Sequence, residues 1–218
     1  MGKYILKRIA LAIVTIWAVA TITFFLMNLV PGGPFLSEKA ISPAATKALE
    51  AKYGLDKPMA ERYFTYISDA AHGDFGDSLK QRGRTVMDII ATKFPVSARL
   101  GGMAVVLALC VGVPLGVLAA YKRGTFIDSL FSVIATCGIA VPGFVICTLL
   151  LYVFGVKLQW LPTLGLKSAQ SYIMPVVALA AYPTSYIMRL MRSSMLDVLG
   201  QDYMRTAKAK GLSQKVSL

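Results

Sequence analysis

The sequence predicts an all-α, polytopic membrane protein with four transmembrane helices, and three observations predict that class. The 218 residues are 56% apolar and only 16% charged, with a mean hydropathy of +0.62, whereas soluble domains contain about a quarter charged residues. Four stretches of at least 21 residues lack Asp, Glu, Lys and Arg, and basic residues gather near their ends. Because about 20 helical residues cross the hydrocarbon core, the expected spans are residues 9–30, 100–121, 129–156 and 168–188.

The first span has features of a secretory signal peptide. Lys3, Lys7 and Arg8 precede it, and Ala18-Val19-Ala20 resembles a cleavage site. The apolar run continues to Val30, however, which is longer than the core of about 7–15 residues in a signal peptide. A retained membrane span is therefore the favoured interpretation, with cleavage as the alternative.

Residues 31–99 form a long connection that we expect to be a small helical cap outside the membrane. One helix is predicted over residues 42–54, because a serine and a proline begin it and a glycine ends it. A second is predicted from Pro58, and a third from the capping box at residues 85–88. Gly73-Asp74-Phe75-Gly76 has the composition of a turn, which either contacts an external partner or only positions the cap.

Glycines and prolines punctuate the second and third spans. Gly112 and Gly116 are four residues apart with Pro114 between them, and Gly138 precedes Pro142. Small residues allow helices to approach closely, and prolines bend them. These residues therefore indicate either ordinary close packing or a pathway lined by bent helices.

The fourth span offers hydroxyl groups and aromatic rings without fixed charge. We expect Tyr182, Ser185 and Tyr186, together with Pro142, to line a pathway for a loosely recognised substrate. The alternative for tyrosines is anchoring at the membrane interface. None of the four spans contains an acidic, basic or histidine side chain, which weakens the alternative of an ATP-independent secondary carrier or channel.

The positions of lysine and arginine predict the topology. Basic residues lie before the first span, at residues 122–123, and throughout residues 189–215, so these three regions are expected in the cytoplasm, with the amino terminus. The external connection is basic too, but it also contains eight acidic residues. The net charge of +12 is therefore attributed to topology and contact with the lipid bilayer, and nucleic acid is not an expected partner.

Catalytic motifs are missing from the sequence. It contains no His-Glu-x-x-His, no Gly-x-Ser-x-Gly and no Gly-x-x-x-x-Gly-Lys-Ser/Thr loop for ATP phosphates. Cys110, Cys137 and Cys147 lie inside predicted spans without the spacing of a metal site. We expect a non-catalytic protein with no metal and no cofactor, so any energy for uphill transport must enter through a partner.

The carboxyl-terminal segment is predicted to be a basic amphipathic helix. From Met195 onward, apolar residues recur at helical spacing, and Gly211 stands where the helix would stop. Ala207 and Gly211 are four residues apart and leave a shallow notch that a neighbouring protein could enter. A helix of this kind also suits a membrane surface, so periodicity alone leaves both interpretations open.

Motifs along the whole chain resemble those of a transporter family. They are Pro31-Gly32-Gly33-Pro34-Phe35, Tyr53-Gly54-Leu55-Asp56-Lys57-Pro58, Gly73-Asp74-Phe75-Gly76-Asp77-Ser78, Gly138-Ile139-Ala140-Val141-Pro142-Gly143-Phe144, Trp160-Leu161-Pro162 and Arg192-Ser193-Ser194-Met195-Leu196. Together they resemble the inner-membrane permease subunits of ABC importers for dipeptides, oligopeptides and nickel. The first motif is most similar to the oligopeptide branch. The resemblance implies a multi-pass protein of the bacterial cytoplasmic membrane.

The end of the chain resembles the cytoplasmic Glu-Ala-Ala-x-x-x-Gly loop of these permeases. Arg205, Thr206 and Ala207 stand at its first three positions and Gly211 at its glycine, and arginine in place of glutamate resembles the peptide subgroup. In this family the loop is the coupling helix that sits in a groove of the ATP-binding subunit. The residues expected to couple to the ATPase are Asp202, Tyr203, Arg205, Thr206, Ala207, Lys210 and Gly211.

The resemblance also implies partners and a length. It implies a second related permease subunit, two ATP-binding subunits and an extracytoplasmic peptide-binding protein. Family members usually have six spans, whereas this sequence stops at Leu218, before the last two. We therefore expect a truncated permease domain, with its spans and external cap followed by a cytoplasmic coupling segment at residues 189–218.

Overall fold

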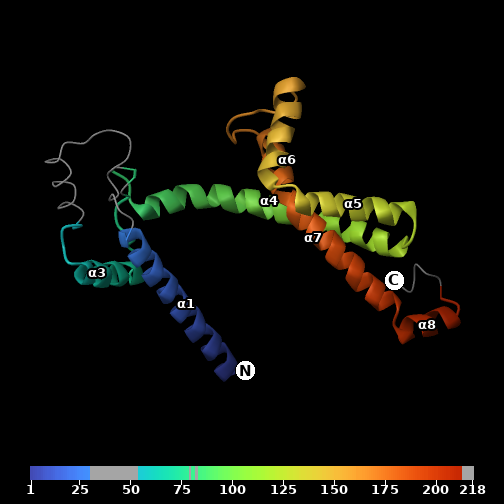
Figure 1. The fold of residues 1–218 in the computed structure, drawn as a ribbon, viewed down its shortest axis with the longest axis horizontal. Coiled ribbons are helices and arrows are strands. Elements are labelled where there is room, and N and C mark those ends of the chain that lie inside the picture. The colour runs from blue at the N-terminus through green and yellow to red at the C-terminus, as the bar shows by residue number, and fades with distance from the viewer. Residues whose placement is uncertain (30–53, 79, 82, 213–218) are drawn as a thin grey trace. The chain divides into compact units, whose positions relative to one another are not determined.

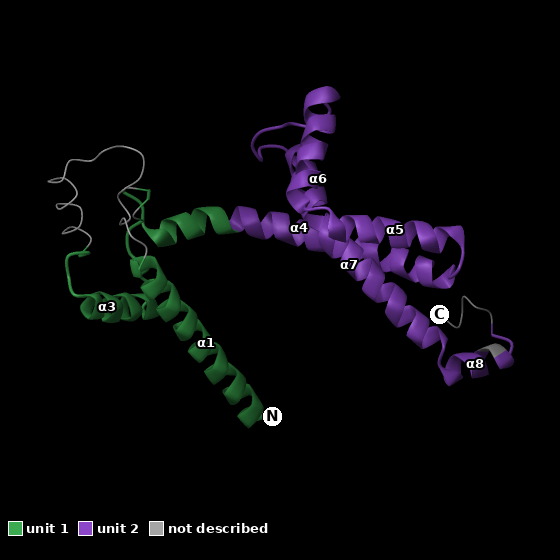
Figure 2. Cartoon of the chain, in the orientation of Figure 1, with its two compact units in different colours: residues 1–94 green, residues 95–218 purple. Residues whose placement is uncertain are grey.

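The computed structural model describes residues 1–29, 54–78, 80–81 and 83–212. Regular structure in these ranges is helical, apart from one isolated antiparallel bridge between Asp77 and Thr85 (Figure 1). The chain divides into two compact units, residues 1–94 and 95–218 (Figure 2). The predicted all-α class is therefore confirmed. The helix predicted over residues 42–54 lies outside the described residues, except for Gly54.

In the first unit, α1 (Gly2–Leu29) and α3 (Met59–Ala71) pack through aromatic rings. Phe24 lies 5.5 Å from Tyr63 and 5.7 Å from Tyr66 between ring centroids. The hydroxyls of Thr21 and Tyr63 are 2.7 Å apart and share a hydrogen bond. The sequence signal at Pro58 was correct, because Pro58 occupies the N-cap position of α3.

The predicted turn and capping box are both present after α3. Gly73 and Gly76 have φ values of +83° and +72°, and the Gly76 amide donates to Asp74 Oδ1 at 2.8 Å. The Asp88 amide donates to Thr85 Oγ1 at 3.0 Å, and the Thr85 amide donates to Asp88 Oδ2 at 3.3 Å. This reciprocal pair satisfies two backbone donors at the start of α4.

The third cap helix and the second span are one continuous helix, α4 (Val86–Tyr121). Its 36 residues give a length of about 54 Å at 1.5 Å per residue, well beyond the ~30 Å hydrocarbon core. The boundary between the two units falls within α4, between Phe94 and Pro95. The capping box was predicted correctly, but no sequence signal between residues 88 and 100 marked the helix as continuous.

In the second unit, the third predicted span is bent. It consists of α5 (Phe126–Ala140), then α6 (Gly143–Leu150) continued by a π-helical segment, η1 (Leu151–Lys157), with an angle of 101° at the break. Pro142 causes the break, because it lacks an amide donor and disfavours helical backbone at the preceding residue. Val141 accordingly has an extended conformation, with φ −83° and ψ 121°.

The fourth predicted span begins with a 3-10 turn, η2 (Ala169–Tyr172), and continues as α7 (Ile173–Leu199). The Ser168 amide donates to Ser171 Oγ at 3.1 Å, which starts this helical stretch. α7 extends beyond the predicted end at Met188, so residues 195–199 belong to α7 and not to a separate tail helix. α8 (Asp202–Ala209) follows after a short break.

Among the described residues, three helical stretches are long and apolar enough to cross a membrane: α1, α4 and η2 with α7. The bent pair of α5 with α6 and η1 is a fourth candidate if it counts as one span. The structure therefore confirms a polytopic α-helical membrane protein. The bend is the feature that the apolar run of residues 129–156 did not reveal.

Candidate functional site

Small residues bring α4 and α7 into close contact. The buried positions of α4 include Ala104, Ala108, Gly112, Gly116 and Ala120, which recur at intervals of four residues. A Cβ atom on Gly112 would lie 2.9 Å from the Thr184 carbonyl oxygen, and one on Gly116 would lie 2.7 Å from the Met188 carbonyl oxygen. The sequence allowed two interpretations of these glycines, ordinary close packing and the lining of a pathway. Their contacts in the structure are those of close packing.

The helix α5 approaches α7 in the same way. A Cβ atom on Gly138 would overlap Ser185 Oγ and lie 3.4 Å from the Ala181 carbonyl oxygen. Ser185 is only 5% exposed, so its hydroxyl lies inside this junction. The helices α4 and α5 therefore each pack closely against α7. These two junctions, α4 with α7 and α5 with α7, share the helix α7.

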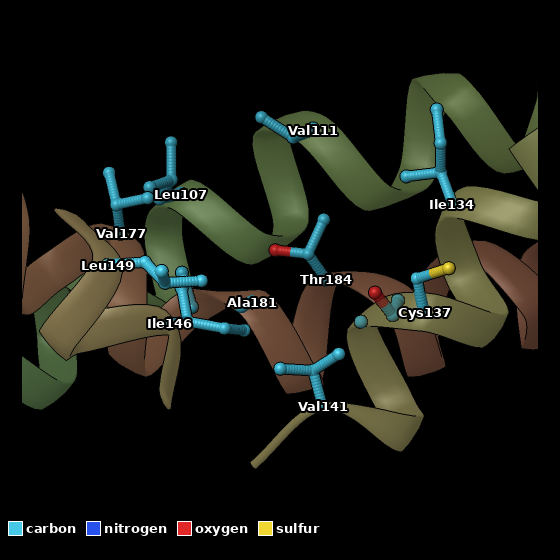
Figure 3. A pocket seen from close by; sticks show the side chains of 13 residues that line it. Leu107, Val111, Ile134, Cys137, Val141, Ile146, Leu149, Val177, Ala181 and Thr184 are labelled. Carbon is cyan, nitrogen blue, oxygen red and sulfur yellow. The ribbon is translucent and has the colours of Figure 1, made fainter. Parts of the chain in front are cut away.

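An open cavity of about 570 Å³ lies beside this junction (Figure 3). Its lining comes from α4, α5, α6 and α7, and includes Val111, Ile134, Ile146 and Val177. The lining is almost entirely apolar, and Thr184 and Ser185 contribute its hydroxyl groups. A volume between about 300 and 1,000 Å³ is typical of ligand sites, but this lining could hold only apolar groups, with one or two hydrogen bonds.

The four predicted pathway residues are not gathered in one site. Ser185 lines the cavity, whereas Tyr182, Tyr186 and Pro142 do not. Tyr182 and Tyr186 are 56% and 55% exposed, and since they are one helical turn apart they share a face of α7. Pro142 is exposed at the bend between α5 and α6. The role of these residues as a pathway lining stays a prediction.

The coupling segment is a separate helix because α7 ends just before it. The Gly200 amide donates to the Leu196 carbonyl at 3.2 Å, and the Gln201 amide donates to the Val198 carbonyl at 3.1 Å. The Met204 amide then donates to the Gln201 carbonyl at 3.1 Å, so Gln201 immediately precedes α8 and accepts a hydrogen bond from its first turn. Two connecting residues, Gly200 and Gln201, thus join α8 to the long helix α7.

Gly211 ends α8 in the conformation that the sequence predicted. Its φ is +78°, in the left-handed region, and the Leu212 amide donates to the Ala207 carbonyl at 3.2 Å. This bond from the residue after the glycine to the carbonyl five residues back defines a Schellman motif. Apart from its two chain neighbours, no atom of the described residues lies within 4 Å of the place where a Gly211 Cβ would stand, so the described structure leaves open space beside it.

Six of the seven predicted coupling residues are exposed, and Ala207 is half-buried. Asp202 organises part of this surface, since Arg205 Nη1 lies 3.5 Å from its Oδ1 and Thr206 Oγ1 donates to its carbonyl at 3.0 Å. Among the described side chains of α8, Met204 is buried, at 4% exposed, whereas most of the predicted coupling residues are exposed.

One ion pair was not found by sequence reasoning. Arg192 Nε and Nη2 donate to Asp128 Oδ1 and Oδ2 at 2.6 and 2.8 Å. The residues are separated by 64 positions, so no local pattern joins them. The available signal was an aspartate directly before an apolar run, together with Arg192 inside one of the family-like motifs.

No three His, Cys, Asp or Glu side chains come together as metal ligands would in the part of the chain that the structure describes. Cys110 and Cys137 are exposed and Cys147 is half-buried, and all three are free thiols. The arrangement of the described residues thus offers helix contacts, an apolar cavity and an exposed helix.

Two family descriptions match the chain in succession. Residues 112–217 match "Binding-protein-dependent transport system inner membrane component", and residues 1–101 match the description of the N-terminal part of such membrane components. Both junctions on α7, the bend and α8 fall within or border the first match.

Individual relatives match over nearly the whole chain. The chain is 44% identical over 217 residues to the oligopeptide transport system permease protein OppB of Salmonella typhimurium, covering 99% of this chain and 71% of that protein. The OppB protein of Escherichia coli is 42% identical, with the same coverage. The dipeptide transport system permease protein DppB of Bacillus subtilis is 43% identical over 213 residues, covering 98% of this chain and 69% of that protein.

Proposed function

The chain belongs to the family of inner-membrane components of binding-protein-dependent transport systems, and from that premise we propose that it forms half of the translocation pathway of an ATP-driven peptide importer. The similar relatives carry the names of oligopeptide and dipeptide permeases. Peptides are therefore the proposed substrate class, with oligopeptides favoured by the Pro-Gly-Gly-Pro-Phe motif at residues 31–35.

The observation that carries the coupling part of this proposal is α8. Its exposed surface includes Asp202, Tyr203, Arg205 and Lys210, and its Schellman end leaves open space beside Gly211. The sequence has no phosphate-binding loop of its own. We propose that an ATP-binding subunit receives α8 in a groove, and that its closure on ATP moves α7 through α8.

The proposed assembly contains two related permease subunits, two ATP-binding subunits and an extracytoplasmic binding protein that delivers the peptide. The proposed orientation has the amino terminus and α8 in the cytoplasm and the α3 region outside, and the positive-inside pattern of the sequence supports it. In this arrangement Tyr182 and Tyr186 line the pathway from the exposed face of α7. Ser185 forms part of the wall behind them, and Pro142 sets the bend of the neighbouring segment.

Reconstitution tests the proposal. The chain is co-expressed with the second permease and ATP-binding subunits of its own transport system, purified and placed in proteoliposomes with the binding protein. The proposal predicts that the ATP-binding subunit co-purifies and that labelled peptide accumulates only when ATP is present on the α8 side. Uptake in vesicles that lack the ATP-binding subunit would favour the alternative of a self-contained carrier or channel.

A further inference from the structure

The pair of Asp128 and Arg192 has the geometry of a strong, directional contact. Two guanidinium nitrogens donate to the two carboxylate oxygens at 2.6 and 2.8 Å. Charge-assisted bidentate pairs of this kind fix the relative orientation of their helices as well as their distance. Asp128 lies in the first turn of α5, and Arg192 lies two turns before the end of α7.

The same carboxylate also holds the turn between α4 and α5. Its Oδ2 accepts a hydrogen bond from the Gly124 amide at 3.1 Å, and Gly124 has a φ of +78°. The Asp128 side chain is 8% exposed and the Arg192 side chain 31% exposed. A carboxylate so little exposed is stable only with such partners, so one side chain connects the turn after α4, the start of α5 and the end of α7.

The packing around the pair leaves little freedom for the three helices to slide. Met188, whose carbonyl is close to Gly116 of α4, lies one helical turn before Arg192. Ser185, which meets Gly138 of α5, lies one further turn back. The ion pair therefore follows directly on two close contacts along α7, and continues the junction toward the end of α7 that leads to α8.

The helix α8 begins at Asp202, ten residues after Arg192. α8 is connected along the chain to the rest of the unit through this last part of α7. Without a contact between α5 and α7 at this level, α7 alone could bend or rotate while α5 stayed in place. The bidentate pair supplies a directional contact of this kind.

We propose that Asp128 and Arg192 are positioning residues that fasten α5 to α7 throughout the transport cycle, so that displacement of α8 moves the α4–α5 turn, α5 and α7 as one body. This inference rests on the proposed function. It adds that the pair stays closed during transport, and that its loss separates ATP hydrolysis from peptide movement.

The first test is Asp128→Asn in the complete, reconstituted transporter. Asparagine keeps an oxygen for the Gly124 amide but loses the charge that binds Arg192. The expected result is at least a fivefold fall in peptide taken up per ATP hydrolysed, with unchanged co-purification of the ATP-binding subunit. Glu61→Gln is the matched control, because it breaks the exposed pair of Lys57 and Glu61 in the other unit, and its ratio should stay within twofold. An unchanged ratio in Asp128→Asn would overturn the inference.

A second test does not depend on how well the neutral variant folds. Asp128→Cys and Arg192→Cys are combined in a background in which Cys110, Cys137 and Cys147 are replaced by alanine, and a short bifunctional thiol reagent then joins the new cysteines. The linked protein is expected to transport at least as well per ATP as the same protein before linking. Loss of uptake upon linking would mean that the helix ends must separate, and the fastening role would be wrong. If the unmodified complex shows no ATP-driven uptake at all, the proposed function fails instead.

Discussion

Gly112 on α4 and Thr184 on α7 are so close that a Cβ atom on the glycine would stand 2.9 Å from the threonine carbonyl oxygen. Backbone cannot give way as a flexible side chain can, so Gly112→Ala forces the helices apart. We expect a loss of about 1–3 kcal/mol in the free energy of unfolding, measured by denaturation of the purified protein in detergent. Gly102→Ala on the same helix is the control, because nothing lies within 4 Å of its Cβ position. Equal effects of the two substitutions would contradict this packing.

The contact between Gly138 and Ser185 predicts a non-additive pair of substitutions. Gly138→Ala places a methyl group against Ser185 Oγ, and we expect destabilisation of about 1–3 kcal/mol. Ser185→Ala removes that oxygen, so the double variant should be more stable than the sum of the single changes predicts, by about 0.5–1 kcal/mol. Strict additivity in the same denaturation assay would show that α5 and α7 do not meet at this point.

The exposed tyrosines of α7 predict a transport defect without an assembly defect. Tyr182→Ala and Tyr186→Ala should each reduce peptide uptake several-fold in the reconstituted transporter, because both rings lie on one exposed face. Co-purification of the ATP-binding subunit should not change. Ile173→Ala is a suitable control, since Ile173 is also exposed on α7, at 46%, but lies nine residues before Tyr182 and so on the opposite face of the helix. A pathway lined elsewhere would leave both tyrosine variants as active as that control.

The topology predicts opposite labelling of two exposed positions. Ser68→Cys on α3 and Gln201→Cys before α8 are introduced singly into a protein without its native cysteines. An impermeant maleimide added to cells without an outer barrier should label position 68 and leave position 201 unlabelled until the membrane is opened. Labelling of both positions in sealed cells would refute a cytoplasmic α8.

Local signals in the sequence were enough for the spans and for several helix ends. The start of α3 at Pro58, the capping box of Thr85 and Asp88, and the left-handed end at Gly211 each depend on residues within a few positions. Such signals act through backbone hydrogen bonds and allowed φ values, and both depend only on residues that are close together in the sequence. They could therefore be read without knowledge of the fold.

Features that depend on distant residues were not accessible in the same way. The apolar run of residues 129–156 predicted one span. Only the structure shows that the span is bent at Pro142, and that the angle there is as large as 101°. The ion pair joins residues 64 positions apart. Ser185 was predicted as a site residue because of its hydroxyl, and its burial against Gly138 depends on how α5 crosses α7. Packing decided each of these points.

The central claim is that α8 docks in a groove of an ATP-binding subunit, and Gly211→Leu in the complete transporter tests it most directly. A leucine there would occupy the open space beside Ala207 and also oppose the φ of +78°, at a cost of about 1–2 kcal/mol for the left-handed backbone. Gly165→Leu is the matched control, because Gly165 has the same φ but lies in the loop between η1 and η2. The double variant Lys208→Glu with Lys215→Glu tests charge instead of shape, because neither lysine is among the predicted coupling residues and on a lipid surface each basic residue contributes about 1 kcal/mol.

The measurement is co-purification of the ATP-binding subunit with each variant at matched membrane levels, together with ATP-driven peptide uptake. Docking in a groove predicts that Gly211→Leu lowers both at least tenfold, while Gly165→Leu and the double glutamate variant retain most of both. Normal association and uptake in Gly211→Leu, with loss of both in the double glutamate variant, would contradict docking and identify α8 as a helix that only rests on lipid.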